Sequence, residues 1–272
     1  PNSKFQGYLV DYNSILVFVL PLEVSAATAM FDNSVLPYLL ENKPEKYKSN
    51  TIKTFGLTES NILDIIKPEI GNKYKVSVNI FSDGLCNDIV VKAKESNNNI
   101  EQITRQIYQK LEKFVYSVTD LSLTDIFEKT LKDKDVKITF IEIISGGCII
   151  NSLSNEIKRD NILISYVTNN SAFICDTFNV TNAQNISKAE ETYDIAVNAL
   201  KLTKSDLVIV TNGEIITNKA ETYIALGDRN KIDVYKNNFS GTKVEILKNI
   251  KNSALFYAIK KIKENDFVFF NK

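Results

Sequence analysis

Hydrophobic and polar positions in the middle of the chain alternate first with the period of a helix and then with that of a strand. Residues 61–66 form a short amphipathic helix, and alternating strands at 75–80 and 86–94 flank an Asp-Gly turn. Apolar positions at helical spacing follow from 100 to 118. Helix, hairpin and helix in succession predict a small α+β domain over 49–120.

From residue 121 onward, apolar runs of strand length alternate with helical segments. This alternation is typical of an α/β fold in which helices are layered on a mainly parallel sheet. The sequence predicts strands at 136–142, 162–168, 207–210, 223–226 and 231–239, and helices at 122–131, 148–155, 189–202 and 244–264.

The N-terminal segment contains one further apolar run, at 15–20. It is much shorter than the roughly 20 residues of a membrane-spanning helix, so we expect a buried strand. A helix at 22–36, stopped by Pro37, and a linker at 43–50 are expected after it. One strand and one helix cannot bury two apolar faces, so residues 1–48 are expected to be the tail of a domain whose earlier part is missing. A small extension packed on the next domain is the alternative.

Composition and charge exclude several classes of function. Lys and Arg number 33 and so do Asp and Glu, so there is no basic excess for nucleic acid or an anionic membrane. The absence of histidine excludes Ser-His-Asp catalysis and His-ligated metal sites. Cys86, Cys148 and Cys175 lack the C-x-x-C spacing of zinc and redox sites. We therefore expect a cytoplasmic protein with no metal, no cofactor, and no nucleic-acid or membrane partner.

The most informative stretch for chemistry follows the strand at 136–142. Glu142 ends this strand, and Ser145-Gly146-Gly147 forms a turn that opens a helix. Glycines allow close approach of a ligand, and the backbone N–H groups of a helix start suit an anion such as phosphate. A plain tight turn is the alternative. Cys148 lies just inside this helix, where the dipole could lower a thiol pKa, or it is a small buried side chain.

Two further polar segments follow strands and could line the same site. We expect a loop at Thr211-Asn212-Gly213-Glu214, and Phe239-Ser240-Gly241-Thr242-Lys243 lies at the start of the last helix. Ligands of open parallel sheets bind at the carboxyl ends of the strands, where such loops gather. A helix cap with a solvated lysine is the alternative for the second segment.

Five short motifs, in order, resemble the CinA family, the competence/damage-inducible proteins. Residues 1–39 resemble the family's P-N…L-P-G-V-P-x-E-M…M-F-E…P-x-L segment, with residues 20–25 (LPLEVS) departing from its L-P-G-V-P-x-E-M part. Residues 54–60 (TFGLTES) resemble its T-F-G-[IL]-x-E-S. Residues 142–147 (EIISGG) lie where the family has E-S-C-T-G-G. Residues 211–213 (TNG) and 239–243 (FSGTK) lie where it has T-G-x-A-G-P and F-x-G-x-R.

The resemblance implies three domains: the tail of a molybdopterin-binding-like domain at 1–48, a KH-like domain at 49–120 and a nicotinamide-nucleotide amidase-like domain at 121–272. It also implies a homo-oligomer and a nicotinamide mononucleotide-like ligand. The residues that would contact this ligand are Glu142, Ser145, Gly146, Gly147, Thr211, Gly213 and Lys243. An RNA-binding role of 49–120 is disfavoured, because these residues lack the G-x-x-G clamp of KH domains.

The two positions that the resemblance assigns to catalysis have lost their chemistry. The serine nucleophile is replaced by Ile143, and the lysine base falls on Ile174 or, in a second register, on Ser171. An isoleucine can neither attack a substrate nor accept a proton. Lys243 also replaces an arginine and its bidentate fork. We expect an inactive descendant that acts as a binding or regulatory module; the alternative is an active deamidase with Ser145 as a displaced nucleophile.

Overall fold

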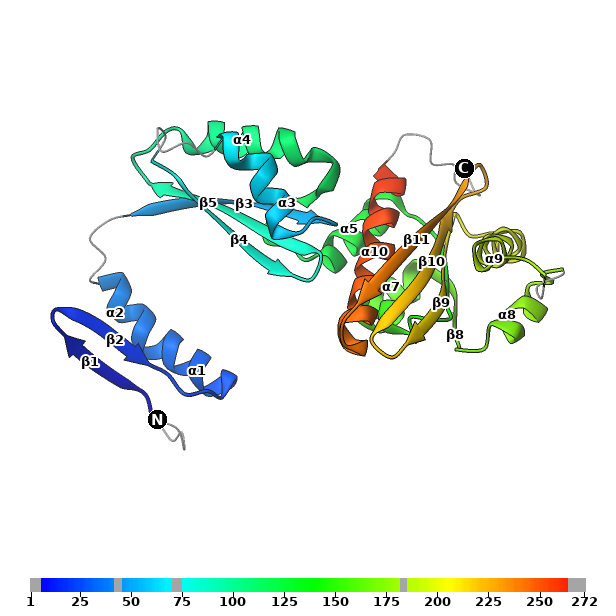
Figure 1. The fold of residues 1–272 in the computed structure, drawn as a ribbon, viewed down its shortest axis with the longest axis horizontal. Helices are drawn as coiled ribbons and strands as arrows, with labels where there is room; N and C mark the ends of the chain where they lie inside the picture. Colours follow the sequence, from blue (N-terminus) through cyan, green and yellow to red (C-terminus); the bar gives the residue numbers. More distant parts are fainter. Residues whose placement is uncertain (1–5, 42–45, 70–74, 182–184, 264–272) are drawn as a thin grey trace. The chain divides into compact units, whose positions relative to one another are not determined.

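The computed structural model describes residues 6–41, 46–69, 75–181 and 185–263 (Figure 1). The chain divides into two compact units: Pro1–Lys48 with Ala93–Asn97, and Ser49–Lys92 with Asn98–Lys272. The segments 49–120 and 121–272 thus lie for the most part in one unit. The three domains expected from the sequence stay predictions.

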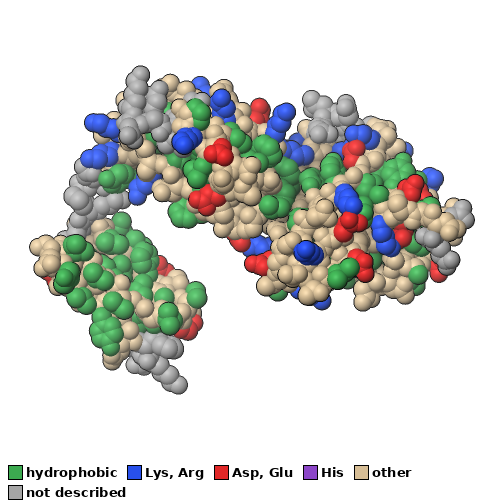
Figure 2. All heavy atoms as spheres, in the orientation of Figure 1, with side chains coloured by type: hydrophobic (Ala, Val, Ile, Leu, Met, Phe, Trp, Pro, Cys, Tyr) green, Lys and Arg blue, Asp and Glu red, His purple; other side chains and the backbone are tan. Residues whose placement is uncertain are grey.

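The first unit contains an antiparallel hairpin of β1 (Tyr8–Tyr12) and β2 (Ile15–Val19). The predicted strand is therefore confirmed, but its predicted burial is wrong. One face of the hairpin carries six exposed apolar or aromatic side chains, those of Tyr8, Val10, Tyr12, Ile15, Val17 and Val19. Figure 2 shows hydrophobic side chains over much of the visible face of this unit. Val35 is the one buried hydrophobic residue described within 6–41.

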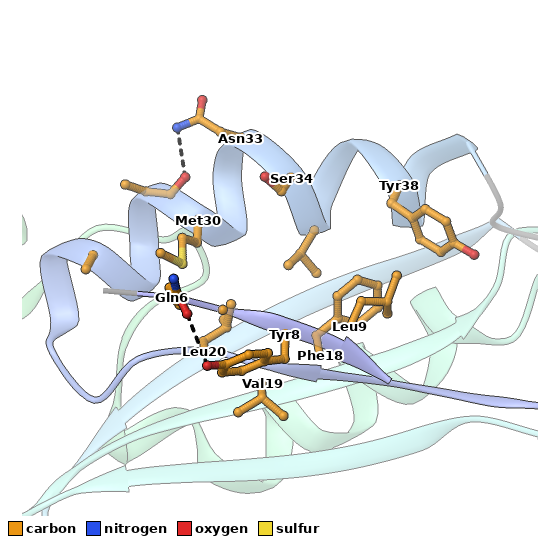
Figure 3. A pocket seen from close by; sticks show the side chains of 14 residues that line it. Gln6, Tyr8, Leu9, Phe18, Val19, Leu20, Met30, Asn33, Ser34 and Tyr38 are labelled. Atoms are coloured by element: carbon orange, nitrogen blue, oxygen red, sulfur yellow. Dashed lines mark hydrogen bonds between the residues drawn. The ribbon is translucent and has the colours of Figure 1, made fainter. Parts of the chain in front are cut away.

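The helical part of this unit continues through Pro37, contrary to the prediction. Helix α1 (Val24–Met30) is followed by a π turn, η1 (Phe31–Val35), and then by α2 (Leu36–Glu41). The π turn restarts the hydrogen-bond pattern, so Pro37 falls in the first turn of α2, where its missing N–H is tolerated. A cleft of about 640 Å³ lies between helices and hairpin, where Phe18 and Tyr38 meet edge to face (Figure 3).

A four-stranded sheet has the order β4-β5-β3-β6. The predicted hairpin is confirmed as β4 (Ser77–Asp83) and β5 (Cys86–Lys94), and the short helix as α3 (Glu59–Ile66). Two expectations are wrong. The end of the expected linker belongs to β3 (Tyr47–Phe55). The helix expected at 100–118 is shorter, α4 (Ile100–Leu111). A 3₁₀ turn at Glu112–Phe114 and a strand, β6 (Val115–Ser117), take up the rest of that range.

The remaining strands form a five-stranded sheet of order β11-β10-β9-β7-β8. β7 (Ile138–Glu142) pairs in parallel with β8 (Ile162–Val167) and β9 (Leu207–Ile216). β10 (Lys219–Gly227) runs antiparallel to β9, to which a two-residue turn joins it, and it also pairs antiparallel with β11 (Ile232–Ser240). The predicted α/β class is confirmed, and the sheet is mixed.

Helices cover both faces of this sheet (Figure 1). The first face packs against α5 (Leu123–Lys134), α6 (Cys148–Ser152) and α10 (Lys243–Lys263), in a buried cluster that includes Phe127, Phe140, Ile149, Ile209 and Leu255. The second packs against α8 (Ser171–Thr177) and α9 (Lys188–Thr203), in a cluster that includes Ile141, Ile174, Ile195, Val208 and Val210. We call these the α10 face and the α9 face. Short helix α7 (Asn155–Asp160) precedes β8. No described helix is long and apolar enough to cross a membrane.

Candidate functional site

Glu142 is the centre of the predicted ligand turn, and its carboxylate is fully buried. One oxygen, Oε1, accepts a hydrogen bond from the Ile150 N–H at 2.8 Å. The other, Oε2, accepts from the Ile149 N–H at 3.1 Å and from the Ser145 hydroxyl at 2.7 Å. The backbone donors that open α6, which could have bound an external anion, therefore bind the protein's own carboxylate.

The Ser145 hydroxyl has a second partner, since its oxygen lies 2.6 Å from that of Thr211 on β9. Both side chains are fully buried. The carbonyl of Thr211 accepts hydrogen bonds from the N–H groups of Ile143 and Ile144, at 2.9 and 3.2 Å. The loop after β7 is thus fixed to β9 by a closed polar network. A hydroxyl that is buried and bonded on two sides is not presented to a substrate.

Both glycines of the turn have positive φ angles. Gly146 has a φ of +61° and Gly147 a φ of +83°, in the left-handed region that favours glycine. A Cβ on Gly147 would lie 3.2 Å from side-chain atoms of Asn151 and Val167, whereas one on Gly146 would meet no atom within 4 Å. Close packing thus favours glycine at position 147, whereas at position 146 only the backbone conformation of the tight turn favours it.

The expected loop at residues 211–214 is not a loop, because these residues continue β9 and pair with β10. Gly213 lies opposite Thr222 with a φ of +134°, and a Cβ there would lie 2.2 Å from the Glu221 carbonyl oxygen. Glycine at this position allows the backbones of β9 and β10 to approach closely. From the sequence alone, such a glycine looks the same as one in a ligand-binding loop.

Lys243 begins α10 with an exposed side chain. Among the proposed ligand contacts, the structure joins Glu142, Ser145 and Thr211 by hydrogen bonds.

The positions that the resemblance assigns to nucleophile and base lie together on the α9 face. Ile143 and Ile174 are both buried, and both belong to the apolar cluster with Ile195 and Val210. Ser145 is bonded to Glu142 and Thr211, whose side chains alternate with this cluster and belong to the α10 face. Ser145 is therefore directed away from the face where the catalytic pair would meet.

A polar cluster that the sequence analysis missed lies on the α9 face, and we call it the Lys188 cluster: Ser171, Lys188, Glu191 and Asn212. The ammonium of Lys188 donates to both carboxylate oxygens of Glu191, at 2.9 and 2.8 Å, and lies 3.4 Å from the Ser171 hydroxyl. The Asn212 amide donates to Glu191 Oε1 at 3.0 Å. The i,i+3 spacing of Lys188 and Glu191 is visible in the sequence, but their contacts with α8 and β9 are not.

The three thiols are not activated. Burial raises the pKa of Cys148 to about 12, with a further contribution from the Glu142 carboxylate, and raises the pKa of Cys86 and of Cys175 to about 11. The Cys148 thiol donates to the Leu247 carbonyl at 3.3 Å, as a half-buried structural side chain. Among the described residues, no group of three or more cysteines and carboxylates could hold a metal ion.

Comparison with known proteins finds several relatives, all described as competence-damage inducible proteins. The chain is 23% identical over 273 residues to one from Caldicellulosiruptor saccharolyticus, covering 92% of this chain and 65% of the relative. It is 24% identical over 220 residues to one from Caldanaerobacter subterraneus, covering 78% and 53%. A third, from Clostridioides difficile, is 28% identical over 166 residues, covering 57% and 40%. The chain thus spans roughly half of the length of these relatives.

Solved structures give matches under the same name. A CinA superfamily protein from Klebsiella pneumoniae is 15% identical, covers 52% of this chain and 95% of its own, and has a TM-score of 0.46. The competence or damage-inducible protein from Enterobacter asburiae is 13% identical, covers 53% and 100%, and has a TM-score of 0.45. No protein-family model matches the chain. The relatives that match along most of its length support an assignment of the chain to the CinA family of competence/damage-inducible proteins.

Proposed function

We propose that this chain has an amidase-like α/β domain without amidase activity, and that it acts as a nucleotide-binding or regulatory module. The observation that carries the proposal is the burial of Ile143 and Ile174 in one apolar cluster. Hydrolysis of an amide needs a nucleophile and a group that accepts its proton. Hydrocarbon fills both positions, so neither role is available there.

The second register, which puts Ser171 at the base position, also leaves the reaction without a base. A hydroxyl does not accept a proton readily, and the nearby Lys188 ammonium donates to both oxygens of Glu191. A protonated amine held in this way has no lone pair to receive a proton. The described contacts therefore support the proposal in either register.

The alternative, a deamidase in which Ser145 is a displaced nucleophile, is less well supported. The Ser145 hydroxyl is buried, donates to the Glu142 carboxylate and is directed to the α10 face. Attack on a substrate would require Ser145 to leave this network and Glu142 to lose a donor inside the protein. A nicotinamide mononucleotide-like ligand and self-association remain part of the proposal, as properties that the resemblance implies.

The test is to incubate nicotinamide mononucleotide with the wild-type protein and with Ser145→Ala, and to measure nicotinic acid mononucleotide and ammonia. We expect neither protein to form product above the buffer blank, with an added product standard to set the detection limit. Turnover by the wild type that Ser145→Ala abolishes would establish the alternative. Turnover that survives Ser145→Ala would also refute the proposal, and would place catalysis elsewhere.

A further inference from the structure

The Lys188 cluster has an inner and an outer layer. Glu191 and Asn212 form the inner layer: the side chain of Glu191 is 7% exposed, and Asn212 is buried. Lys188 and Ser171 form the outer layer, where the lysine side chain is 42% exposed and the serine is half-buried. A molecule that approaches from solvent therefore meets an ammonium and a hydroxyl, while the carboxylate lies behind them.

Burial of this carboxylate has an energetic cost that packing alone would not require. Desolvation of a buried ion pair commonly offsets its attraction, and apolar residues of similar size are often at least as stabilising. Here Glu191 fixes the ammonium of Lys188 through two hydrogen bonds, and Asn212 fixes Glu191 in turn. The outer donors are therefore held in place before any ligand arrives.

The location of the cluster is the second observation. On β9, Asn212 follows Val208 and Val210 on the α9 face, at the carboxyl end of the parallel strands. Ser171 begins α8, the helix that contains Ile174. The cluster thus lies at the edge of the sheet where α/β folds bind ligands, and on the same face as Ile143 and Ile174.

We infer that Lys188 and Ser171 form an anion-binding site for the phosphate or carboxylate group of a small ligand, with Glu191 and Asn212 as positioning residues. The inference rests on the proposed function only in expecting that a ligand binds at this edge. An ammonium and a hydroxyl supply hydrogen-bond donors to an anionic oxygen, and such charge-assisted bonds are the stronger kind. The Lys188 ammonium raises the affinity for an anion. The Glu191 carboxylate lowers it, because its negative charge compensates that of the lysine.

The experiment is a calorimetric titration of the 272-residue protein with inorganic phosphate, with nicotinamide mononucleotide and with acetate as a simple carboxylate. The variants are Lys188→Met, Lys188→Arg and Glu191→Gln. The control is Lys201→Met, an exposed lysine near the other end of α9. Thermal unfolding of each variant shows which of them are folded.

We expect Lys188→Met to weaken anion binding about tenfold or more, the effect of losing one charge-assisted hydrogen bond. Lys188→Arg and Lys201→Met should bind nearly as the wild type does. Glu191→Gln should bind anions more tightly, because the carboxylate no longer offsets the ammonium charge. If Glu191→Gln is unfolded, the lysine variants decide alone. The acetate and phosphate arms show which anion is preferred.

Wild-type protein that binds none of the three probes, or Lys188→Met that binds them like the wild type, would overturn the inference. Hydrolysis of nicotinamide mononucleotide would refute the proposed function but leave this result untouched. The two failures are therefore distinguishable.

Discussion

The side-chain oxygens of Ser145 and Thr211 lie 2.6 Å apart in the interior, and this contact joins the loop after β7 to β9. Ser145 also donates to Glu142, whose carboxylate accepts two backbone N–H groups of α6. The turn that sequence patterns associate with an external anion is thus completed by an internal one. The polar groups of this turn form hydrogen bonds within the protein, so we expect substitutions there to change its stability.

The first prediction concerns this network. Ser145→Ala should lower the free energy of unfolding by about 1–3 kcal/mol, since Thr211 and Glu142 lose a buried partner. Urea denaturation measures the change. Thr211→Val and the double variant complete a cycle, in which the double variant should cost less than the two single changes together. Equal stability of Ser145→Ala and the wild type would show that the network is not formed.

The second prediction concerns the apolar cluster on the α9 face. Ile143→Ser should destabilise the protein by about 2–4 kcal/mol, because it leaves a cavity and buries a hydroxyl. Ile216→Ser is the matched control: it makes the same change at a side chain that is 64% exposed, where about 0.5 kcal/mol or less is expected. Similar losses at the two positions, measured by chemical denaturation, would argue against burial of Ile143.

The third prediction compares two glycines in the left-handed region. Gly213→Ala should cost about 2–3 kcal/mol, since its Cβ would lie 2.2 Å from the Glu221 carbonyl oxygen and force β9 and β10 apart. Gly146→Ala should cost only about 1 kcal/mol, because its Cβ would meet no atom within 4 Å and only the backbone conformation is unfavourable. Thermal unfolding ranks the two variants, and the reverse order would be inconsistent with β9 as described.

The fourth prediction concerns the thiols, whose pKa burial raises to about 11 for Cys86 and Cys175 and to about 12 for Cys148. At pH 8 all three should react with an aromatic disulfide reagent far more slowly in the folded protein than in urea. Folding favours the protonated thiols, so their contribution to stability is complete below the ordinary thiol pKa of about 8.5 and is lost as the pH rises above it. A thiol that reacts at its unfolded rate would contradict the burial found here.

Local patterns in the sequence predicted most of the secondary structure but not what covers it. The apolar run at 15–20 was assigned correctly to a strand and wrongly to the interior, because exposure depends on neighbouring layers that periodicity does not encode. The helix predicted from the spacing of apolar residues was longer than α4, because Val115 continues that spacing although it belongs to β6. Gly213 was interpreted as part of a loop because glycine marks loops and close strand contacts alike.

The candidate site was predictable only where residues adjacent in sequence act together. Glu142 ends β7, and the Gly146-Gly147 turn after it leads into α6, as expected. Contacts between distant segments were not predictable. Lys188 reaches Ser171 and Glu191 reaches Asn212 only because α8, α9 and β9 pack together. The hydrogen bond that ties Ser145 to Thr211, while Ile143 packs in the apolar cluster of the α9 face, also joins distant segments.

The most direct measurement is ammonia release when nicotinamide mononucleotide is mixed with an equal concentration of the wild-type protein and followed for many hours. At this ratio, even one turnover per molecule would be visible. Ile143 and Ile174, the residues at the positions that the proposed function assigns to nucleophile and base, are buried in one apolar cluster, so we predict no ammonia beyond the protein-free control. Stoichiometric release with matching nicotinic acid mononucleotide would contradict the proposed function.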